Sequence, residues 1–314
     1  MKKVIFFGTP PFAAKVLKFL LINHIDILAI VTKPDKPRGR GKHSSFSAVK
    51  KWAHENYPHI PILQPNKASS HTFITQLKCF NPDLLVVVAY GEIISQELLN
   101  LPKLGAINLH ASLLPQYRGA SPIQSVLFDG MKRTGVTIIE MTHKMDAGDI
   151  LSQEEVLISE EMNCQELEEE LCKVGCILLL KVIKQYHTLT KTPQNHTKAT
   201  YVQKIQSNMT QIDWQCDAQH IHNQVRALSP SPGAWCYIIL GENQKRLKIY
   251  RSRVKKGTNH CLPGETLSFT PQGWHVACKE GGGLLLLELQ LEGKRRLSAK
   301  EFYQGISFPL KIKI

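Results

Sequence analysis

A continuous apolar run in the first third of the chain constrains the fold more than any other feature. Residues 83–91 read Asp-Leu-Leu-Val-Val-Val-Ala-Tyr-Gly, an apolar stretch that ends in a glycine turn. A strand with apolar residues on both faces must be covered on both sides, as in the parallel sheets of α/β proteins. The run therefore predicts a central strand of a mostly parallel sheet, with helices packed against both faces.

The N-terminal residues predict a βαβ unit in the same sheet. Residues 4–7 are apolar and end at Gly8, apolar residues then recur at helical spacing from Phe12 to Leu20, and a second strand is expected at 25–31. The turn at Gly8 has neither a G-x-G-x-x-G nor a G-x-x-x-x-G-K-[ST] pattern, so neither dinucleotide nor P-loop nucleotide binding is signalled. We expect no signal peptide, because too few apolar residues follow the basic start.

Cysteine usage and hydropathy favour a cytoplasmic protein. The eight cysteines include no C-x-x-C pair, which favours free thiols in a reducing compartment over a zinc site or a disulfide framework. No run approaches the ~18 apolar residues that indicate a spanning helix. We therefore expect a cytoplasmic protein that binds no metal and does not enter a membrane.

The charge of the chain is strongly positive and unevenly distributed. The net charge is +13; residues 201–314 carry 16 Lys and Arg against 8 Asp and Glu, whereas residues 1–200 carry 23 against 18. A basic excess of this kind is typical of proteins that bind a polyanion such as nucleic acid.

A further basic region, residues 33–50, is rich in proline, glycine and positive charge. We expect no packed element in such a composition, apart from a short helix that begins near residue 48. Arg38, Arg40 and Lys42 are candidates for contacts with a nucleic-acid backbone, because guanidinium and ammonium groups neutralise phosphates. A solvated charge run is the alternative interpretation.

The last part of the chain predicts a second domain. A long amphipathic helix at 165–186 closes a first domain, expected at 1–188, and an exposed, threonine-rich linker is expected at 189–207. The second domain, expected at 208–314, begins with a helix over 216–228. Short strands are then predicted at 234–240, 247–253, 264–269, 273–277 and 284–291. Short strands joined by glycine turns predict a small barrel of the oligonucleotide-binding (OB) type.

Asn108 and His110 are the leading candidates for a functional site. They lie at the end of a short apolar strand, 106–109, and because side chains alternate across a strand they must point to the same face. Ligands of open α/β sheets bind just outside the carboxyl ends of the strands. The pair is therefore expected at a ligand-binding edge.

The end of the apolar run is a second candidate. Ala89, Tyr90 and Gly91 form a turn whose backbone groups could hydrogen-bond a flat heterocycle. An ordinary turn between a strand and a helix is the alternative.

Asp146 adds a carboxylate that suits acyl or formyl transfer to an amine. Such a reaction needs a base, a donor for the developing oxyanion and a group that orients the base. His110 can act as the base, Asn108 as the oxyanion donor and Asp146 as the support of the imidazole. No G-x-S-x-G motif occurs, which favours direct transfer over an acyl-enzyme. A structural histidine and an ordinary turn aspartate are the alternatives.

Several motifs resemble the signature of the folate-dependent formyltransferases. The central ones are Asn108-Leu-His110, Ser112-Leu-Leu-Pro115, Tyr117-Arg-Gly-Ala120, Pro122-Ile123 and Met145-Asp-Ala-Gly-Asp149. The motifs that resemble the members acting on methionyl-tRNA are Phe7-Gly-Thr-Pro10, Gly39-Arg-Gly-Lys42, Ile212-Asp-Trp214 and Pro232-Gly-Ala-Trp235. The resemblance spans nearly the whole chain.

The resemblance implies a Rossmann-like formyltransferase domain followed by an OB-like domain that binds tRNA. The implied catalytic residues are Asn108, His110 and Asp146, and the implied tetrahydrofolate contacts are Ser112, Leu113, Leu114 and Pro115. The co-substrate would be 10-formyltetrahydrofolate. The acceptor would be the methionine amino group of initiator methionyl-tRNA, and the product would serve translation initiation.

The same resemblance implies that Arg40 and Lys42 grip the acceptor stem of the tRNA. We also expect a monomer. Gln116, Ser121 and Ser231 depart from the residues usual in the family. A formyltransferase acting on a small amine such as a sugar nucleotide, a formyltetrahydrofolate hydrolase and a non-catalytic RNA-binding protein are the alternatives.

Overall fold

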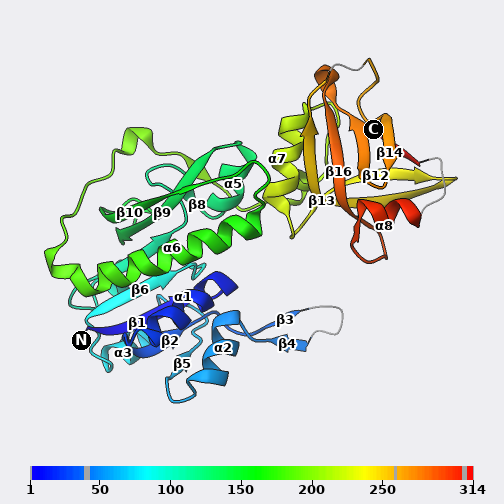
Figure 1. Ribbon diagram of the computed structural model, residues 1–314. Coiled ribbons are helices and arrows are strands. Elements are labelled where there is room, and N and C mark those ends of the chain that lie inside the picture. The colour runs from blue at the N-terminus through cyan, green and yellow to red at the C-terminus, as the bar shows by residue number, and fades with distance from the viewer. Residues whose placement is uncertain (1, 39–42, 258–259, 306–309, 314) are drawn as a thin grey trace. The chain divides into compact units, whose positions relative to one another are not determined.

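The computed structural model describes residues 2–38, 43–257, 260–305 and 310–313, and the chain divides into two compact units. Unit 1 comprises Met1–Gly119, Thr134–Val156 and Glu168–Val202. Unit 2 comprises Ala120–Arg133, Leu157–Leu167 and Gln203–Ile314. Each unit is built around its own large sheet (Figure 1).

Unit 1 contains a seven-stranded sheet in the order β10-β9-β7-β6-β1-β2-β5. Its strands are β1 (Lys3–Gly8), β2 (Asp26–Val31), β5 (Ile62–Leu63), β6 (Leu84–Val88), β7 (Ala106–His110), β9 (Arg133–Glu140) and β10 (Ile150–Leu157). β1 is parallel to β2 and β6, β2 to β5, and β6 to β7, whereas β9 is antiparallel to β7. The predicted Rossmann-like, mostly parallel sheet is confirmed; β10 was not predicted.

β6 is the central strand that the apolar run predicts, since it lies between β1 and β7 and all of its residues are buried. On one face, Val87 shares a core cluster with Phe73 of α3 (His71–Lys78) and Leu98 of α4 (Gln96–Leu99). On the other, α1 (Pro11–Ile22) packs on β1 and β6, and Gly175 of α6 (Cys164–Gln185) lies against Leu109. Helices therefore cover both faces, and Figure 1 shows α6 running across the sheet.

The basic region forms a short hairpin before its helix. β3 (Lys36–Arg38) pairs antiparallel with β4 (His43–Ser45), and α2 (Ala48–Asn56) follows as predicted. The expectation that no regular element precedes residue 48 is wrong. A two-stranded ribbon satisfies backbone groups by its own pairing, so it forms without the apolar residues that a core strand requires.

Two shorter features complete the description of the chain outside the large sheets. β8 (Arg118–Gly119) and β11 (Tyr201–Val202) pair in parallel and form a separate two-stranded ribbon. Single 3-10 turns lie at Tyr186–Thr188, His196–Lys198, Ser207–Thr210 and Lys279–Gly281. Within the described residues, no helix is long and apolar enough to cross a bilayer.

Unit 2 contains an antiparallel sheet in the order β14-β15-β16-β13-β12-β18, with β17 beside β16. Its strands are β12 (Ala234–Leu240), β13 (Asn243–Lys255), β14 (Thr266–Thr270), β15 (Gly273–Ala277), β16 (Gly283–Leu291), β17 (Leu297–Ser298) and β18 (Leu310–Lys313). Its helices are α5 (Pro122–Phe128), α7 (Ala218–Leu228) and α8 (Ala299–Gln304). The predicted OB-like second domain is confirmed as a curled half-barrel, and the five predicted strands are present; β17, β18 and α8 were not predicted.

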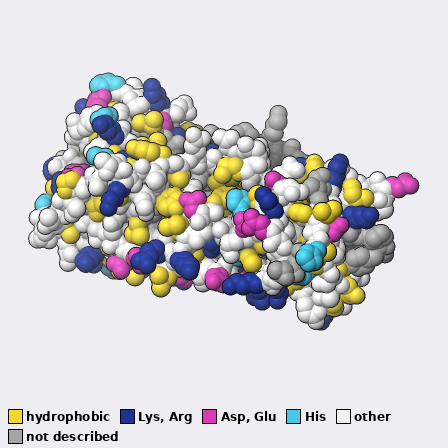
Figure 2. Space-filling view, turned by 90° about the horizontal axis from the view of Figure 1, so that it is seen from above, with side chains coloured by type: hydrophobic (Ala, Val, Ile, Leu, Met, Phe, Trp, Pro, Cys, Tyr) yellow, Lys and Arg dark blue, Asp and Glu magenta, His cyan; other side chains and the backbone are white. Residues whose placement is uncertain are grey.

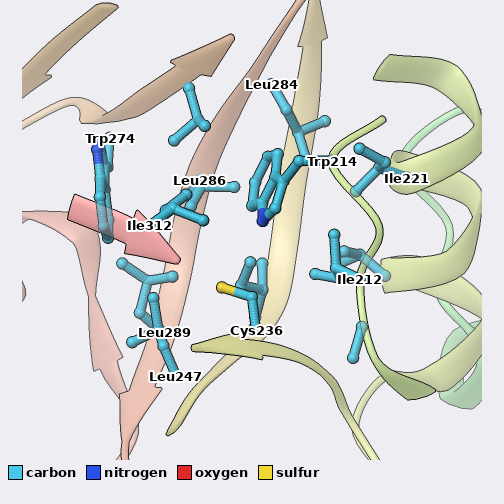
Figure 3. Packing of buried hydrophobic residues seen from close by; sticks show 14 of the residues in the cluster. Ile212, Trp214, Ile221, Cys236, Leu247, Trp274, Leu284, Leu286, Leu289 and Ile312 are labelled. Carbon is cyan, nitrogen blue, oxygen red and sulfur yellow. The ribbon is translucent and has the colours of Figure 1, made fainter. Parts of the chain in front are cut away.

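The core of unit 2 lies between this sheet and α7. Asp217 caps α7 by accepting a hydrogen bond from the His220 N–H at 2.8 Å, and the predicted apolar face of the helix is buried. Trp214 fills the space between Ile221 of α7 and the sheet, with its indole nitrogen on the side of Cys236 (Figure 3). Residues of β12 alternate, so that Cys236 points into the core and its neighbours point away.

Candidate active site

The carboxyl end of β7 brings the three predicted catalytic side chains together. Asn108 Nδ2 lies 3.4 Å from Asp146 Oδ1, and His110 Nδ1 lies 3.7 Å from Asp146 Oδ2. Asn108 and His110 therefore face the same carboxylate, as their spacing in the strand requires. The His110 side chain is only 6% exposed and that of Asp146 14%, which shields their charges from solvent.

Asp146 is held in an unusual backbone conformation. Its φ is +50°, in the left-handed region that non-glycine residues seldom adopt. The Gly119 N–H donates to Asp146 Oδ2 at 2.9 Å, so the oxygen that faces His110 is also fixed by a backbone donor. The carboxylate thus has one oxygen toward the amide of Asn108 and the other toward the imidazole.

His110 is fixed from its other side by a backbone carbonyl. Its Nε2 lies 2.9 Å from the carbonyl oxygen of Tyr117. A carbonyl can only accept, so this contact places a proton on Nε2 and, in the neutral ring, leaves Nδ1 unprotonated. Nδ1 is the atom that faces Asp146. A proton taken up at Nδ1 would form an ion pair with the carboxylate.

The loop at 112–115 is held by hydrogen bonds from β9 and β10. Thr137 donates to the Ser112 carbonyl at 2.6 Å and accepts from the Leu114 N–H at 3.1 Å. Gln153 donates to the Leu114 carbonyl at 2.7 Å. The Ser112 hydroxyl donates to the Gln116 carbonyl at 2.7 Å and Leu114 is buried. Of the four residues of this loop that are predicted to contact folate, only Leu113 and Pro115 have partly exposed side chains.

The turn after β6 lies level with His110, because Val87 is paired with Asn108 in the parallel register. Ala89 and Gly91 both have positive φ, and a Cβ at Gly91 would meet nothing within 4 Å. The backbone of this turn is therefore open to a ligand.

Tyr90, between those two residues, is held by the core. Its ring packs edge-on against Phe7 at 5.3 Å, its carbonyl accepts from Thr9 at 3.0 Å, and burial together with the nearby Glu92 carboxylate raises the pKa of its phenol. The side chain anchors the turn, whose open part is the backbone of its neighbours.

The first residues of the basic region are held in place by an ion pair and hydrogen bonds. Asp35 accepts hydrogen bonds from Lys50 and, at 2.8 Å, from Gln64 Nε2, and these two bonds lower the pKa of its carboxyl. Lys50 also donates to Gln64 Oε1 at 2.7 Å. The backbone of Arg38 lies in β3. Arg40 and Lys42 lie outside the described residues.

Arg118 and Gln194, which were not predicted as site residues, lie next to the turn that carries Asp146. Arg118 is 2% exposed and Gln194 6%, and Gln194 bonds both to Arg118 and to the turn of Asp146. The expectation that residues 189–207 form an exposed linker fails at Gln194. The one signal in the sequence was the place of Arg118 within the central motif. Across the described residues, no group of three or more His, Cys, Asp or Glu could hold a metal ion.

The sequence matches the models of a known class of enzyme. Residues 1–183 match the family model described as "Formyl transferase", and residues 204–307 match "Formyl transferase, C-terminal domain". The chain therefore belongs to the formyl transferase family. The resemblance found in the motifs is confirmed, as is the expectation of an enzyme that transfers a formyl group.

Similar curated proteins narrow the class further. The chain is 46% identical to the methionyl-tRNA formyltransferase of Protochlamydia amoebophila, over 97% of this chain and 95% of that protein. It is 38% identical to the methionyl-tRNA formyltransferase of Staphylococcus epidermidis, over 100% of this chain and 99% of that protein.

Solved structures share the fold at lower identity. WlaRD, a sugar 3N-formyl transferase solved in the presence of dTDP and 5-N-formyl-THF, has a TM-score of 0.67 and 19% identity, covering 94% of this chain and 99% of its own. HypX from Aquifex aeolicus, in complex with tetrahydrofolic acid, has a TM-score of 0.63 and 15% identity, covering 99% of this chain and 50% of its own. At these identities the likeness concerns the fold alone.

Proposed function

We propose that this chain transfers the formyl group of 10-formyltetrahydrofolate to the free amino group of methionine on initiator methionyl-tRNA. The observation that carries the proposal is the cluster of Asn108, His110 and Asp146 at the carboxyl end of β7. The full-length similarity to methionyl-tRNA formyltransferases supports the choice of acceptor.

Direct transfer follows from the groups that the cluster supplies. The methionine nitrogen attacks the formyl carbon, a C–N bond forms, and the carbonyl electron pair moves to oxygen. Because a side-chain amide has two N–H donors, Asn108 can keep its contact with Asp146 and donate the other N–H to the oxyanion. His110 takes the proton of the attacking nitrogen at Nδ1, and Asp146 stabilises the imidazolium.

Collapse of the tetrahedral intermediate completes the reaction. The oxyanion re-forms the carbonyl, the bond between the formyl carbon and N10 breaks, and N10 receives the proton held by His110. The products are tetrahydrofolate and N-formylmethionyl-tRNA, and His110 returns to its neutral form. No residue of the chain forms a covalent intermediate.

The folate co-substrate fits the open backbone beside the cluster. We assign its contacts to two segments, the loop of Ser112, Leu113, Leu114 and Pro115 and the turn of Ala89, Tyr90 and Gly91. The buried side chains of Ser112, Leu114 and Tyr90 hold these segments in place, and the other four residues offer the accessible groups. The loop offers the partly exposed Leu113 and Pro115 on a backbone fixed by Thr137, and the turn offers the open backbone at Gly91. These are groups that suit an apolar, flat ligand with a polar edge.

For the tRNA we assign phosphate contacts to Arg38, Arg40 and Lys42, and a further surface to unit 2. That surface, here the outer face, consists of Trp235, Tyr237, Arg246, Lys248 and Lys313. Lys248 pairs with Trp235 across β12 and β13, Arg246 with Tyr237, and Lys313 of β18 also with Tyr237. The Arg246 guanidinium lies 4.1 Å from the centre of the Trp235 ring.

An outer face of alternating cations and aromatic rings suits a nucleic-acid backbone and its bases. Figure 2 shows one face of the molecule, on which Lys and Arg side chains are interspersed with acidic and neutral ones. We assign catalysis to residues 1–188 and tRNA binding to 208–314. Residues 189–207 join them in the sequence, and of these Gln194 is buried in unit 1. A cytoplasmic location and a monomeric state stay predictions.

A label-transfer assay tests the proposed acceptor. The protein is incubated with 10-formyltetrahydrofolate labelled in the formyl group, and label is measured on initiator methionyl-tRNA, uncharged tRNA, free methionine, an amino-sugar nucleotide and water. We expect label on methionyl-tRNA alone. Label on the sugar nucleotide or release to water would instead support one of the two alternative activities.

A further inference from the structure

The side-chain amide of Gln194 connects a buried arginine to the backbone of the Asp146 turn. Its Oε1 accepts from Arg118 Nη2 at 2.6 Å and from Arg118 Nε at 3.2 Å. Its Nε2 donates to the Asp146 carbonyl at 2.9 Å and to the Gly148 carbonyl at 2.6 Å. The two N–H donors and the oxygen acceptor of this amide therefore all have partners within hydrogen-bond distance.

The orientation of the amide is determined by its partners. A guanidinium only donates and a backbone carbonyl only accepts. If the amide were reversed, its NH₂ group would face the N–H groups of Arg118 and its oxygen would face the two carbonyl oxygens of the turn. Arg118 is itself held, because its Nη2 also contacts His196 Nδ1 at 3.0 Å and its Nη1 contacts the Tyr201 hydroxyl at 3.3 Å.

The turn that Gln194 holds is the one that presents the carboxylate to His110. Asp146 has a left-handed backbone, and a Cβ at Gly148 would lie 1.8 Å from the carbonyl oxygen of Glu140, so the turn is pressed against β9. Such a conformation persists only when its surroundings stabilise it. Two N–H donors that bind the Asp146 and Gly148 carbonyls together supply that stabilisation.

We propose that Gln194, oriented by Arg118, is a positioning residue for transfer: it keeps the Asp146 carboxylate beside His110 and touches neither substrate. The inference rests on the role proposed above for Asp146. Displacement of the carboxylate lowers the rate of proton transfer, because catalytic groups act only within about 0.5 Å of the productive geometry. Substrate binding is left unchanged.

Gln194→Glu separates the contact with Arg118 from the contacts with the Asp146 turn. The glutamate carboxylate still accepts the hydrogen bonds from Arg118, and more strongly because it is charged. It has no N–H, so both hydrogen bonds to the turn are lost. We expect kcat to fall by about tenfold or more while KM for both substrates stays within about threefold, the pattern of a lost transition-state interaction. Gln194→Leu, which brings no buried charge, should lose kcat to a similar extent. Lys191→Ala is the matched control, because it removes the Lys191–Glu140 ion pair of the same segment and leaves the bonds of Gln194 in place.

A double-mutant cycle with Asp146→Ala distinguishes positioning from a general structural role. If Gln194 acts through Asp146, adding Gln194→Glu to Asp146→Ala should change single-turnover transfer by less than about twofold. An undiminished further loss, an unchanged kcat in Gln194→Glu, or an equal loss in Lys191→Ala overturns the positioning role. If Asp146→Ala itself leaves transfer unchanged, the proposed role of Asp146 fails as well. A loss in Asp146→Ala with none in Gln194→Glu removes the positioning role alone.

Discussion

The cluster at Asp146 and the outer face of the half-barrel use polar groups in opposite ways. His110 and Asp146 are almost enclosed, and each polar atom of their side chains lies within 3.7 Å of a polar neighbour. Arg246 and Lys313 of the outer face are exposed, and their charges act through solvent. The interaction energy of a shielded charge depends on the exact position of its few partners, whereas the attraction of a solvated charge to a ligand is screened and adds to that of its neighbours. Single substitutions should therefore act strongly at the first region and weakly at the second.

His110→Ala should have the largest effect. Removal of a general base typically costs about 10²–10⁴ in rate, so kcat for methionyl-tRNA should fall within that range. Affinity for tRNA, measured by filter binding, should change by less than about twofold, because the phosphate contacts are elsewhere. A loss of binding as large as the loss of rate would contradict this separation of roles.

Asn108→Ala should follow, with a loss of kcat of about 10²–10³, the effect of removing one donor to an oxyanion. The KM for 10-formyltetrahydrofolate should stay close to that of the unchanged protein. Single-turnover kinetics would measure the loss, with the thermal midpoint as a check on folding. An effect confined to KM would show that Asn108 binds folate and does not stabilise the oxyanion.

Replacement of Arg246 and Lys248 by Ala should have a moderate effect that depends on salt. Two lost phosphate contacts should weaken tRNA binding by roughly tenfold at low salt and lower the slope of log K against log salt by about two. Arg40→Ala with Lys42→Ala should do the same, and kcat at saturating tRNA should be unchanged in both. An unaltered salt slope would make the altered region an ordinary solvated surface.

His222 tests whether unit 2 also contains a polar group held as tightly as those of the cluster. It is buried in α7 and contacts the Ser252 hydroxyl and the Glu160 carbonyl, each at 3.0 Å. Burial lowers the pKa of His222 below its ordinary value, so the folded unit favours the neutral ring. The unfolded chain binds the proton more readily, and stability should therefore fall as pH decreases below about 6.5.

The measurement is urea unfolding between pH 5 and 8, followed by tryptophan fluorescence, since Trp214, Trp235 and Trp274 all lie in unit 2. His222→Gln should reduce the dependence on pH over this range. Equal dependence in the two proteins would assign it to other groups. The change in stability expected for His222→Gln is the smallest of these effects, because it comes from the pKa shift of a single side chain.

Much of the fold could be predicted because it depends on local pattern. The apolar run of β6, the helical period of α7 and the alternation of β12 each report burial directly from the order of residues. β17 and β18 could not be predicted, because two and four residues carry too short a pattern. The ribbon of β8 and β11 could not either, since its pairing joins residues far apart in the sequence.

The sequence by itself determined that Asn108 and His110 share a face, because a strand leaves no other arrangement. Only the tertiary structure decided what surrounds them. Asp146 reaches them across a distant turn, and Gln194, from a polar segment with the composition of an exposed linker, is buried behind that turn. The reason is physical: the position of a side chain along a strand is a local property, whereas a hydrogen-bonded amide needs partners that folding brings together.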